Sequence, residues 1–188
     1  MEYLRTQGDA FEQASVDEAY LELENDDHDN DDDKRYRRAE KLAREIKAHI
    51  KKTEQLTCSI GIGPNKLIAK IAASERKPDG LTIVRSDEVQ QFLNPKPGGA
   101  IPGIGPKARE ALGKIGVKTI AQLRAIPEYQ LIERFGKQGE GMYRRARGIE
   151  NLEAILPGRG AELAGRRARR QNRRIRQPLI ADRRHRRR

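Results

Sequence analysis

The pattern of apolar and polar positions predicts a mixed α+β fold. Residues 19, 21 and 23 are apolar and alternate with Tyr20 and Glu22, which is typical of a half-buried strand. Residues 39–50 instead show apolar side chains at helical spacing, with Lys and Arg between them. A β-rich run over 56–62, a helix that begins at 63–65 with Pro64 in its first turn, and a strand over 81–84 follow. The order is strand, strand, helix, strand, helix, strand.

Beyond residue 85 the pattern is helical. The clearest signal lies between Ile101 and Leu112, where two glycines flank Ile104 and Pro106 preorganises the helix that follows. The free amides of that helix N-terminus and Lys107 could bind a phosphate. This is the pattern of a helix-hairpin-helix, which contacts the nucleic-acid backbone without reading bases. Without a ligand, the same segment would be a glycine-rich connection between helices.

The positive charge is concentrated at the end of the chain. Of the formal net charge of +11, residues 151–188 contribute +10, from 13 Arg and 3 acidic residues. This Arg-rich tail shows no sustained helical or strand period, so we expect it to be disordered and able to bind nucleic acid without specificity. It is either an evolved basic arm or the product of a lost reading frame in a GC-rich gene, and we favour the second explanation.

Other candidate sites are excluded by spacing. Residues 25–33 form an acidic block that we expect to be a solvated loop, because the glycine and glutamate of a calcium loop are missing. The segment from Gly61 to Lys66 lacks the spacing of a phosphate-binding P-loop. The three histidines have no ligand-spaced partners, and Cys58 is expected to be a small buried side chain. No apolar run could span a membrane and no signal peptide is evident, so we expect a cytoplasmic protein.

Two adjacent carboxylates, Asp17 and Glu18, stand at the start of the first alternating run. Neighbouring side chains of an extended strand point to opposite faces, so the pair can serve one site only if the backbone turns or bulges there. Carboxylates at the rim of a sheet could hold Mg²⁺, which also takes water and phosphate oxygens. On spacing alone, an acidic dipeptide in a charged chain is more often solvated surface.

Three segments resemble one family in the same order. The run from Ser15 to Leu21 is similar to the second catalytic motif of the Y-family (DinB-like, DNA polymerase IV) translesion DNA polymerases, and 59–80 and 100–117 match the same family. The resemblance implies a partial ferredoxin-like palm over residues 1–85, with the acidic loop 25–33, and a small all-helical thumb over 86–150, with the helix-hairpin-helix at 100–117. The tail at 151–188 replaces the little finger.

The resemblance also implies roles for individual residues. Asp17 and Glu18 would hold two Mg²⁺ ions for nucleotidyl transfer from a dNTP to a primer 3′-hydroxyl, and Lys77 would reach the triphosphate. The hairpin would hold the DNA primer-template. Its residues are Gly103, Ile104, Gly105 and Lys107. The resemblance leaves open a sliding clamp as a further partner and gives no reason to expect a membrane.

The sequence departs from the family at both ends. The N-terminal part with the first metal-binding aspartate and the fingers has no counterpart, so the two-metal site is incomplete and we expect this chain alone to be inactive or very weak. The alternative function is a non-catalytic DNA-binding module, in which the hairpin and the tail bind the DNA backbone. A third interpretation is a truncated product that never folds stably, because its sheet lacks strands.

Overall fold

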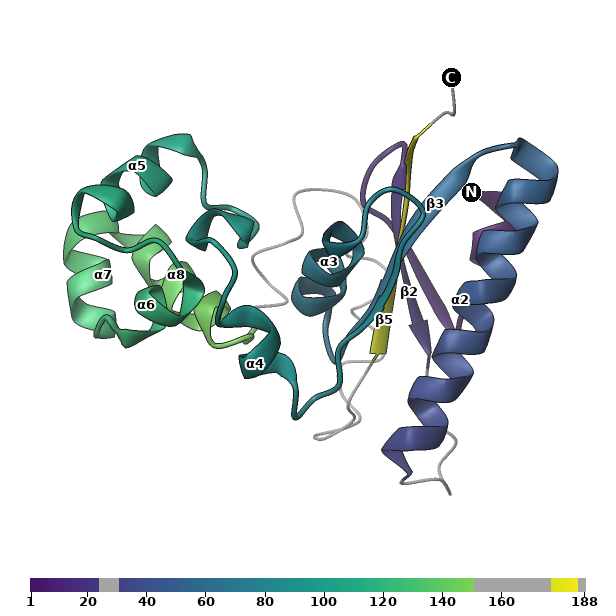
Figure 1. Ribbon diagram of the computed structural model, residues 1–188, viewed down its shortest axis with the longest axis horizontal. Helices are drawn as coiled ribbons and strands as arrows, with labels where there is room; N and C mark the ends of the chain where they lie inside the picture. The colour runs from purple at the N-terminus through teal and green to yellow at the C-terminus, as the bar shows by residue number, and fades with distance from the viewer. Residues whose placement is uncertain (24–30, 151–176, 186–188) are drawn as a thin grey trace, which may run out of the picture.

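The computed structural model describes residues 1–23, 31–150 and 177–185, the last as backbone only. A five-stranded sheet forms the centre of the first part, with strand order β1-β2-β5-β3-β4 (Figure 1). Neighbouring strands run antiparallel except β3 and β4, which are parallel. The strands are β1 (Ala10–Gln13), β2 (Glu18–Leu23), β3 (Thr57–Ile62), β4 (Leu81–Ile83) and β5 (Gln177–His185).

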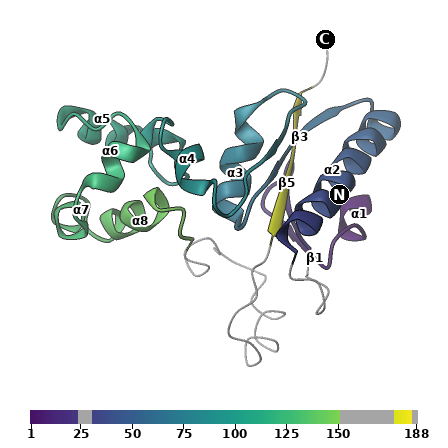
Figure 2. The same cartoon turned by 60° about the horizontal axis from the view of Figure 1, so that its bottom comes forward.

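Two helices cover opposite faces of this sheet (Figure 2). The long helix α2 (Asp32–Glu54) buries its apolar stripe against one face, together with the short α1 (Glu2–Arg5). The core on this side contains Ala19, Leu21 and Leu23 of β2, and Cys58 is 1% exposed within it. Helix α3 (Lys66–Glu75) covers the other face with small residues, so that Tyr20 packs on Ala69 and Ala73. The alternation predicted which side chains of β2 share a face, but the expectation of a half-buried strand is wrong: both faces are covered, and only Glu22 is partly exposed.

The position of β5 corrects the expectation of a disordered tail. Residues 177–185 form the central strand, paired with all six residues of β2 on one side and with β3 on the other. A strand between two others has partners for its backbone N–H and C=O groups along both edges, which an isolated segment lacks. The rest of the expected disordered tail, 151–176 and 186–188, lies outside the described residues.

The acidic block needs a second correction. Its last residues belong to the start of α2, where Asp31 is the N-cap and its side chain accepts a hydrogen bond from the Asp33 amide at 2.9 Å. Acidic side chains are favourable in the first turn of a helix because they interact with the positive end of its dipole. The remaining part of the expected loop, 25–30, is not described. Helix α3 likewise begins later than predicted, since Asn65 is its N-cap and Pro64 precedes it.

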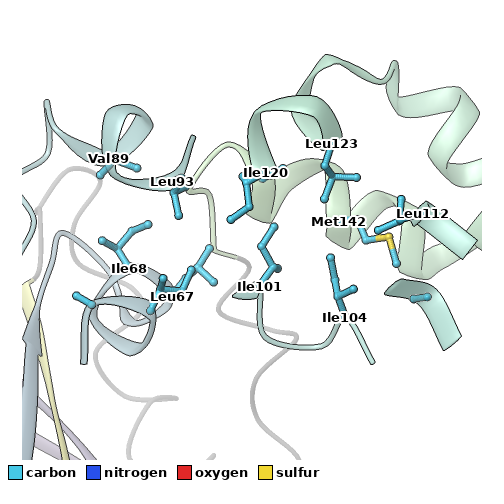
Figure 3. Packing of buried hydrophobic residues seen from close by; sticks show 14 of the residues in the cluster. Leu67, Ile68, Val89, Leu93, Ile101, Ile104, Leu112, Ile120, Leu123 and Met142 are labelled. Atoms are coloured by element: carbon cyan, nitrogen blue, oxygen red, sulfur yellow. The ribbon is translucent and has the colours of Figure 1, made fainter. Parts of the chain in front are cut away.

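The helical region continues from α3 through one apolar core (Figure 3). Leu67 and Ile68 of α3 pack in the same cluster as Val89 and Leu93, and the cluster extends to Met142. No helix among the described residues is long and apolar enough to cross a lipid bilayer. The elements are α4 (Val89–Leu93), η1 (Gly98–Ala100), α5 (Pro106–Lys114), α6 (Ile120–Ala125), α7 (Glu128–Phe135) and α8 (Lys137–Ala146).

Candidate active site and nucleic-acid interface

The carboxylates Asp17 and Glu18 lie where the chain turns from β1 into β2. Both the Ala14 and the Ser15 amides donate to the Glu18 carbonyl, at 3.0 and 3.1 Å, which closes a tight connection around residues 15–17. The Ser15 hydroxyl donates to Asp17 Oδ1 at 2.6 Å and accepts from the Glu18 amide at 3.1 Å. Asp17 is half-buried in the turn, while Glu18 is the first, buried residue of the strand. The backbone therefore turns at the carboxylate pair, as a shared site would require.

Helix α3 places a lysine beside the buried carboxylate. Lys70 Nζ donates to Glu18 Oε2 at 2.8 Å, and the Glu18 side chain is only 11% exposed. A buried carboxylate requires a compensating charge or hydrogen bonds, and this ion pair supplies both. Lys66, one helical turn earlier, forms the corresponding ion pair with Glu12 of β1. Neither lysine is predicted as a site residue from the sequence, although their spacing of four residues on a helix of small side chains is a usable signal.

Tyr20 fills the space between the two lysine–carboxylate pairs. Its ring lies 5.5 Å from Lys66 Nζ, and burial together with the negative charge of Glu18 raises the pKa of its phenol well above the usual range. The phenol therefore stays protonated at physiological pH. Its role is packing against α3 rather than acid–base chemistry.

The loop with Lys77 joins α3 to β4 at the same end of the sheet as the carboxylates. Lys77 is exposed, and the Gly80 amide at the end of this loop donates to Ser59 Oγ at 3.2 Å. Ser59 and Glu18 are both register partners of Asp182 in β5, one on each side. Neighbouring strands lie about 4.8 Å apart, so Ser59 and Glu18 are separated by about 10 Å across the sheet. The register thus brings the lysine loop and the carboxylates to the same end of the sheet.

The donor atoms at this end of the sheet suit a hard divalent cation. Asp17 and Glu18 provide carboxylate oxygens, and Mg²⁺ is commonly held by one or two carboxylates together with phosphate oxygens. Within residues 1–23 and 31–150, no three side chains of His, Cys, Asp or Glu gather into a complete metal cage. A cation held by these two carboxylates would have to take its remaining ligands from water and a phosphate substrate.

The helix-hairpin-helix has the geometry that the sequence predicts. Gly103 has a φ of +87°, a left-handed conformation that favours glycine, and its carbonyl accepts a hydrogen bond from Gln138 of α8 at 2.9 Å. Gly105 is the N-cap of α5 and Pro106 follows it in the first turn. Nothing lies within 4 Å of the position that a Cβ of Gly105 would occupy. The amides at the start of α5 are therefore accessible to a ligand.

The two predicted side chains of the hairpin differ in exposure. Lys107 is exposed in the first turn of α5, so it can add positive charge beside the free amides. Ile104 is only 4% exposed, and its side chain packs in the apolar core (Figure 3). Its amide donates to the Ile101 carbonyl at 3.2 Å, so this residue shapes the hairpin rather than offering a free amide. Arg145 of α8 lies behind the hairpin, with its guanidinium 3.4 Å from the Cβ position of Gly103. Burial lowers the pKa of this arginine.

Two family models match successive parts of the chain. Residues 1–74 match the impB/mucB/samB family, and residues 99–150 match the thumb domain of DNA polymerase iota. The first match contains β1, β2 and the carboxylate pair, and the second contains the hairpin and helices α5 to α8. The two matches therefore contain the carboxylate turn and the helix-hairpin-helix described above.

Curated relatives support the same assignment. DNA polymerase IV 2 from Methanosarcina mazei is 39% identical over 155 residues, which cover 82% of this chain and 40% of the relative. DNA polymerase IV from Methanoculleus marisnigri is 43% identical over 143 residues, covering 76% of this chain and 38% of the relative. The chain thus spans about two fifths of the length of these relatives.

Solved structures of the same group superpose on this chain. DinB from Sulfolobus solfataricus matches with a TM-score of 0.70 and 33% identity, over 81% of this chain and 44% of that chain. An insertion ternary complex of Dbh DNA polymerase matches with a TM-score of 0.69 and 34% identity, over the same shares. The order of the motifs, the two family models and the superposed structures agree. The chain therefore matches a fragment of the Y-family, DinB-like DNA polymerases.

Proposed function

We propose that this chain carries the palm carboxylates and the thumb of a translesion DNA polymerase. The observation that supports the proposal most directly is the turn at Asp17 and Glu18, which lies at the same end of the sheet as the loop of Lys77. In nucleotidyl transfer, the primer 3′-hydroxyl gives up its proton to water and its oxygen attacks the α-phosphorus of a dNTP. The new O–P bond forms while the bond from the α-phosphorus to the bridging oxygen breaks, and pyrophosphate leaves with that electron pair. The helix-hairpin-helix would meanwhile hold the DNA backbone.

Each group then has a definite task. Bound Mg²⁺ would stabilise the charge of the entering and leaving oxygens. Asp17 and Glu18 would hold the ions, with Ser15 fixing Asp17 through a hydrogen bond of 2.6 Å. Lys77 would neutralise the triphosphate, and the amides of Gly103 and Gly105 with Lys107 would bind DNA phosphates, while Ile104 anchors the hairpin in the apolar core. Because the substrates are DNA and nucleotides, the same proposal places the chain in the cytoplasm.

The competing function, a non-catalytic DNA-binding module, is less well supported. Of its two parts, the hairpin lies in the match to the thumb domain and the tail lies in neither match, whereas residues 1–74 match the impB/mucB/samB family through a segment that contains both carboxylates. A module that only bound DNA would need no ordered carboxylate turn. The polymerase therefore accounts for more of the chain.

A primer-extension assay with Mg²⁺ tests the proposal. We expect slow incorporation of the correct nucleotide on an undamaged and on a damaged template, and its loss in Asp17→Asn. The control is Asp87→Asn, which changes an exposed carboxylate that precedes α4. Incorporation that survives Asp17→Asn would contradict the proposed catalytic role. DNA binding without any Asp17-dependent incorporation would instead favour the non-catalytic module.

A further inference from the structure

The loop that carries Lys77 is held by a lysine of the opposite layer. Lys47 lies on α2, and its ammonium reaches past the sheet edge to the residues between α3 and β4. Nζ donates to Asp79 Oδ1 at 2.5 Å, to the Asp79 carbonyl at 2.9 Å and to the Cys58 carbonyl at 2.6 Å. The Gly80 carbonyl lies 3.4 Å away. One ammonium thus connects strand β3 with two consecutive residues of the loop.

These contacts saturate the ammonium. Lysine has three N–H donors and no acceptor, and three close oxygens satisfy all of them. The Lys47 side chain is 18% exposed, so it is largely removed from water at a site where a surface lysine would ordinarily stay solvated. A largely buried ammonium is stable only when it is fully paired. Removing the ammonium would leave the oxygens of the loop without this donor.

The loop itself needs such support. Residues 76–79 are exposed, and Asp79 adopts a positive φ of 59°, an unusual conformation for a residue other than glycine. Strand β3 also holds the end of the loop, because the Gly80 amide donates to Ser59 Oγ and the Gly80 carbonyl accepts from the Ile60 amide at 3.0 Å. The loop is therefore held by two groups, strand β3 and the Lys47 ammonium.

We propose that Lys47 is a positioning residue for the triphosphate of the incoming nucleotide, acting through the loop that presents Lys77. This inference rests on the proposed function, because it assigns Lys77 to the triphosphate. Lys47 itself contacts only protein atoms in the contacts described above. By fixing Asp79 and Gly80, it would fix the backbone from which Lys77 extends two residues earlier. Small displacements of a group that binds substrate cost affinity and rate.

The test uses the full chain and four variants: Lys47→Met, Lys77→Met, the double variant, and Lys51→Met. Lys51→Met is the matched control, since Lys51 is exposed on the same helix one turn later. Methionine keeps an unbranched stem but removes the ammonium. Binding of dATP with Mg²⁺ is measured by calorimetry, and hydrogen exchange of residues 76–81 is measured in parallel.

We expect Lys47→Met to accelerate exchange of the loop amides about tenfold or more, as the loss of a charge-assisted hydrogen bond predicts. We expect it also to weaken dATP binding about fivefold, while Lys51→Met changes neither. The double variant should bind dATP as weakly as Lys77→Met alone, because Lys47 acts only through Lys77. A merely structural role would instead make the two effects additive.

Three results would overturn the inference. Unchanged loop exchange in Lys47→Met would show that the ammonium does not anchor the loop. Additive losses in the double variant would show that Lys47 does not act through Lys77. Absence of dATP binding by the unmodified chain would refute the proposed function together with the inference. Asp79→Ala removes an acceptor without removing the ammonium, so it repeats the test if Lys47→Met does not fold.

Discussion

The contact between β3 and α3 predicts a large effect of a single added methyl group at Gly61. A Cβ on Gly61 would lie 2.1 Å from the Ala69 carbonyl oxygen and 2.3 Å from the Ala73 amide nitrogen. Both are backbone atoms of α3, so no side-chain rotation relieves the overlap. An ordinary contact begins at 3.4 Å, and α3 would therefore have to retreat by about 1.3 Å from the sheet.

Overpacking of this kind typically costs about 1–3 kcal/mol, and backbone on both sides places Gly61→Ala near the upper value. For a chain of this length, we expect the melting temperature to fall by about 5–10 °C. The same retreat would stretch the 2.8 Å ion pair between Lys70 and Glu18.

Thermal melting by circular dichroism, compared with Gly113→Ala, measures the effect. Gly113 lies near the end of α5 with nothing within 4 Å of its Cβ position, so alanine there should stabilise the helix by about 0.5–1 kcal/mol. Opposite signs for the two glycine-to-alanine changes are therefore expected. If Gly61→Ala melts with the unmodified chain, the close packing of α3 on β3 is wrong, and with it the placement of Lys70 beside Glu18.

Two further predictions concern the hairpin and a buried carboxylate. Gly103→Ala should lower the free energy of unfolding by about 1–3 kcal/mol, because alanine is strained at the positive φ of this position. Gly105→Ala should leave stability unchanged but weaken DNA binding, since its Cβ would stand before the free amides. Equal stability losses in melting and equal affinities in salt-controlled DNA titration would refute this difference. The Glu150 carboxylate accepts a hydrogen bond from the Leu67 amide at 3.2 Å, and burial raises the pKa of this carboxyl. The native state therefore binds the proton more tightly than the unfolded chain does, and the protein loses stability as the pH rises through the raised pKa. Glu150→Gln should therefore raise the melting temperature at pH 8 but not at pH 4, and an equal difference at both values would contradict the sign.

Local patterns predicted those parts of the fold that depend on local rules. The alternation in β2, the apolar stripe of α2 and the glycine hairpin before α5 each follow from the period or the backbone preference of a few neighbouring residues. The sequence predicts a turn at Asp17 and Glu18 only if the two carboxylates share a site, because spacing alone does not distinguish a strand from a bend. The Ser15 hydroxyl, which closes that turn, supplies the physical reason.

The remaining features depend on contacts between distant segments. Strand β5 was missed because its partners are more than 100 residues away, and an Arg-rich sequence gives little β signal of its own. Lys47 and Lys70 look like ordinary surface lysines until α2 and α3 are packed on the sheet, where each meets an oxygen-rich site. The sequence pattern predicts which residues share a face of each helix, but it does not predict which residues of the sheet and its loops that face contacts.

The central claim is that Asp17 and Glu18 hold a divalent cation beside a nucleotide triphosphate. Electron paramagnetic resonance of free Mn²⁺, titrated with the full chain in the presence of dATP, measures this directly in the unmodified protein, Asp17→Asn, Glu18→Gln and the control Asp87→Asn. The account predicts that each of the first two substitutions weakens Mn²⁺ binding about tenfold or more, as expected when a charged ligand becomes neutral, while the control binds normally. Equal Mn²⁺ affinity in all four proteins would contradict it.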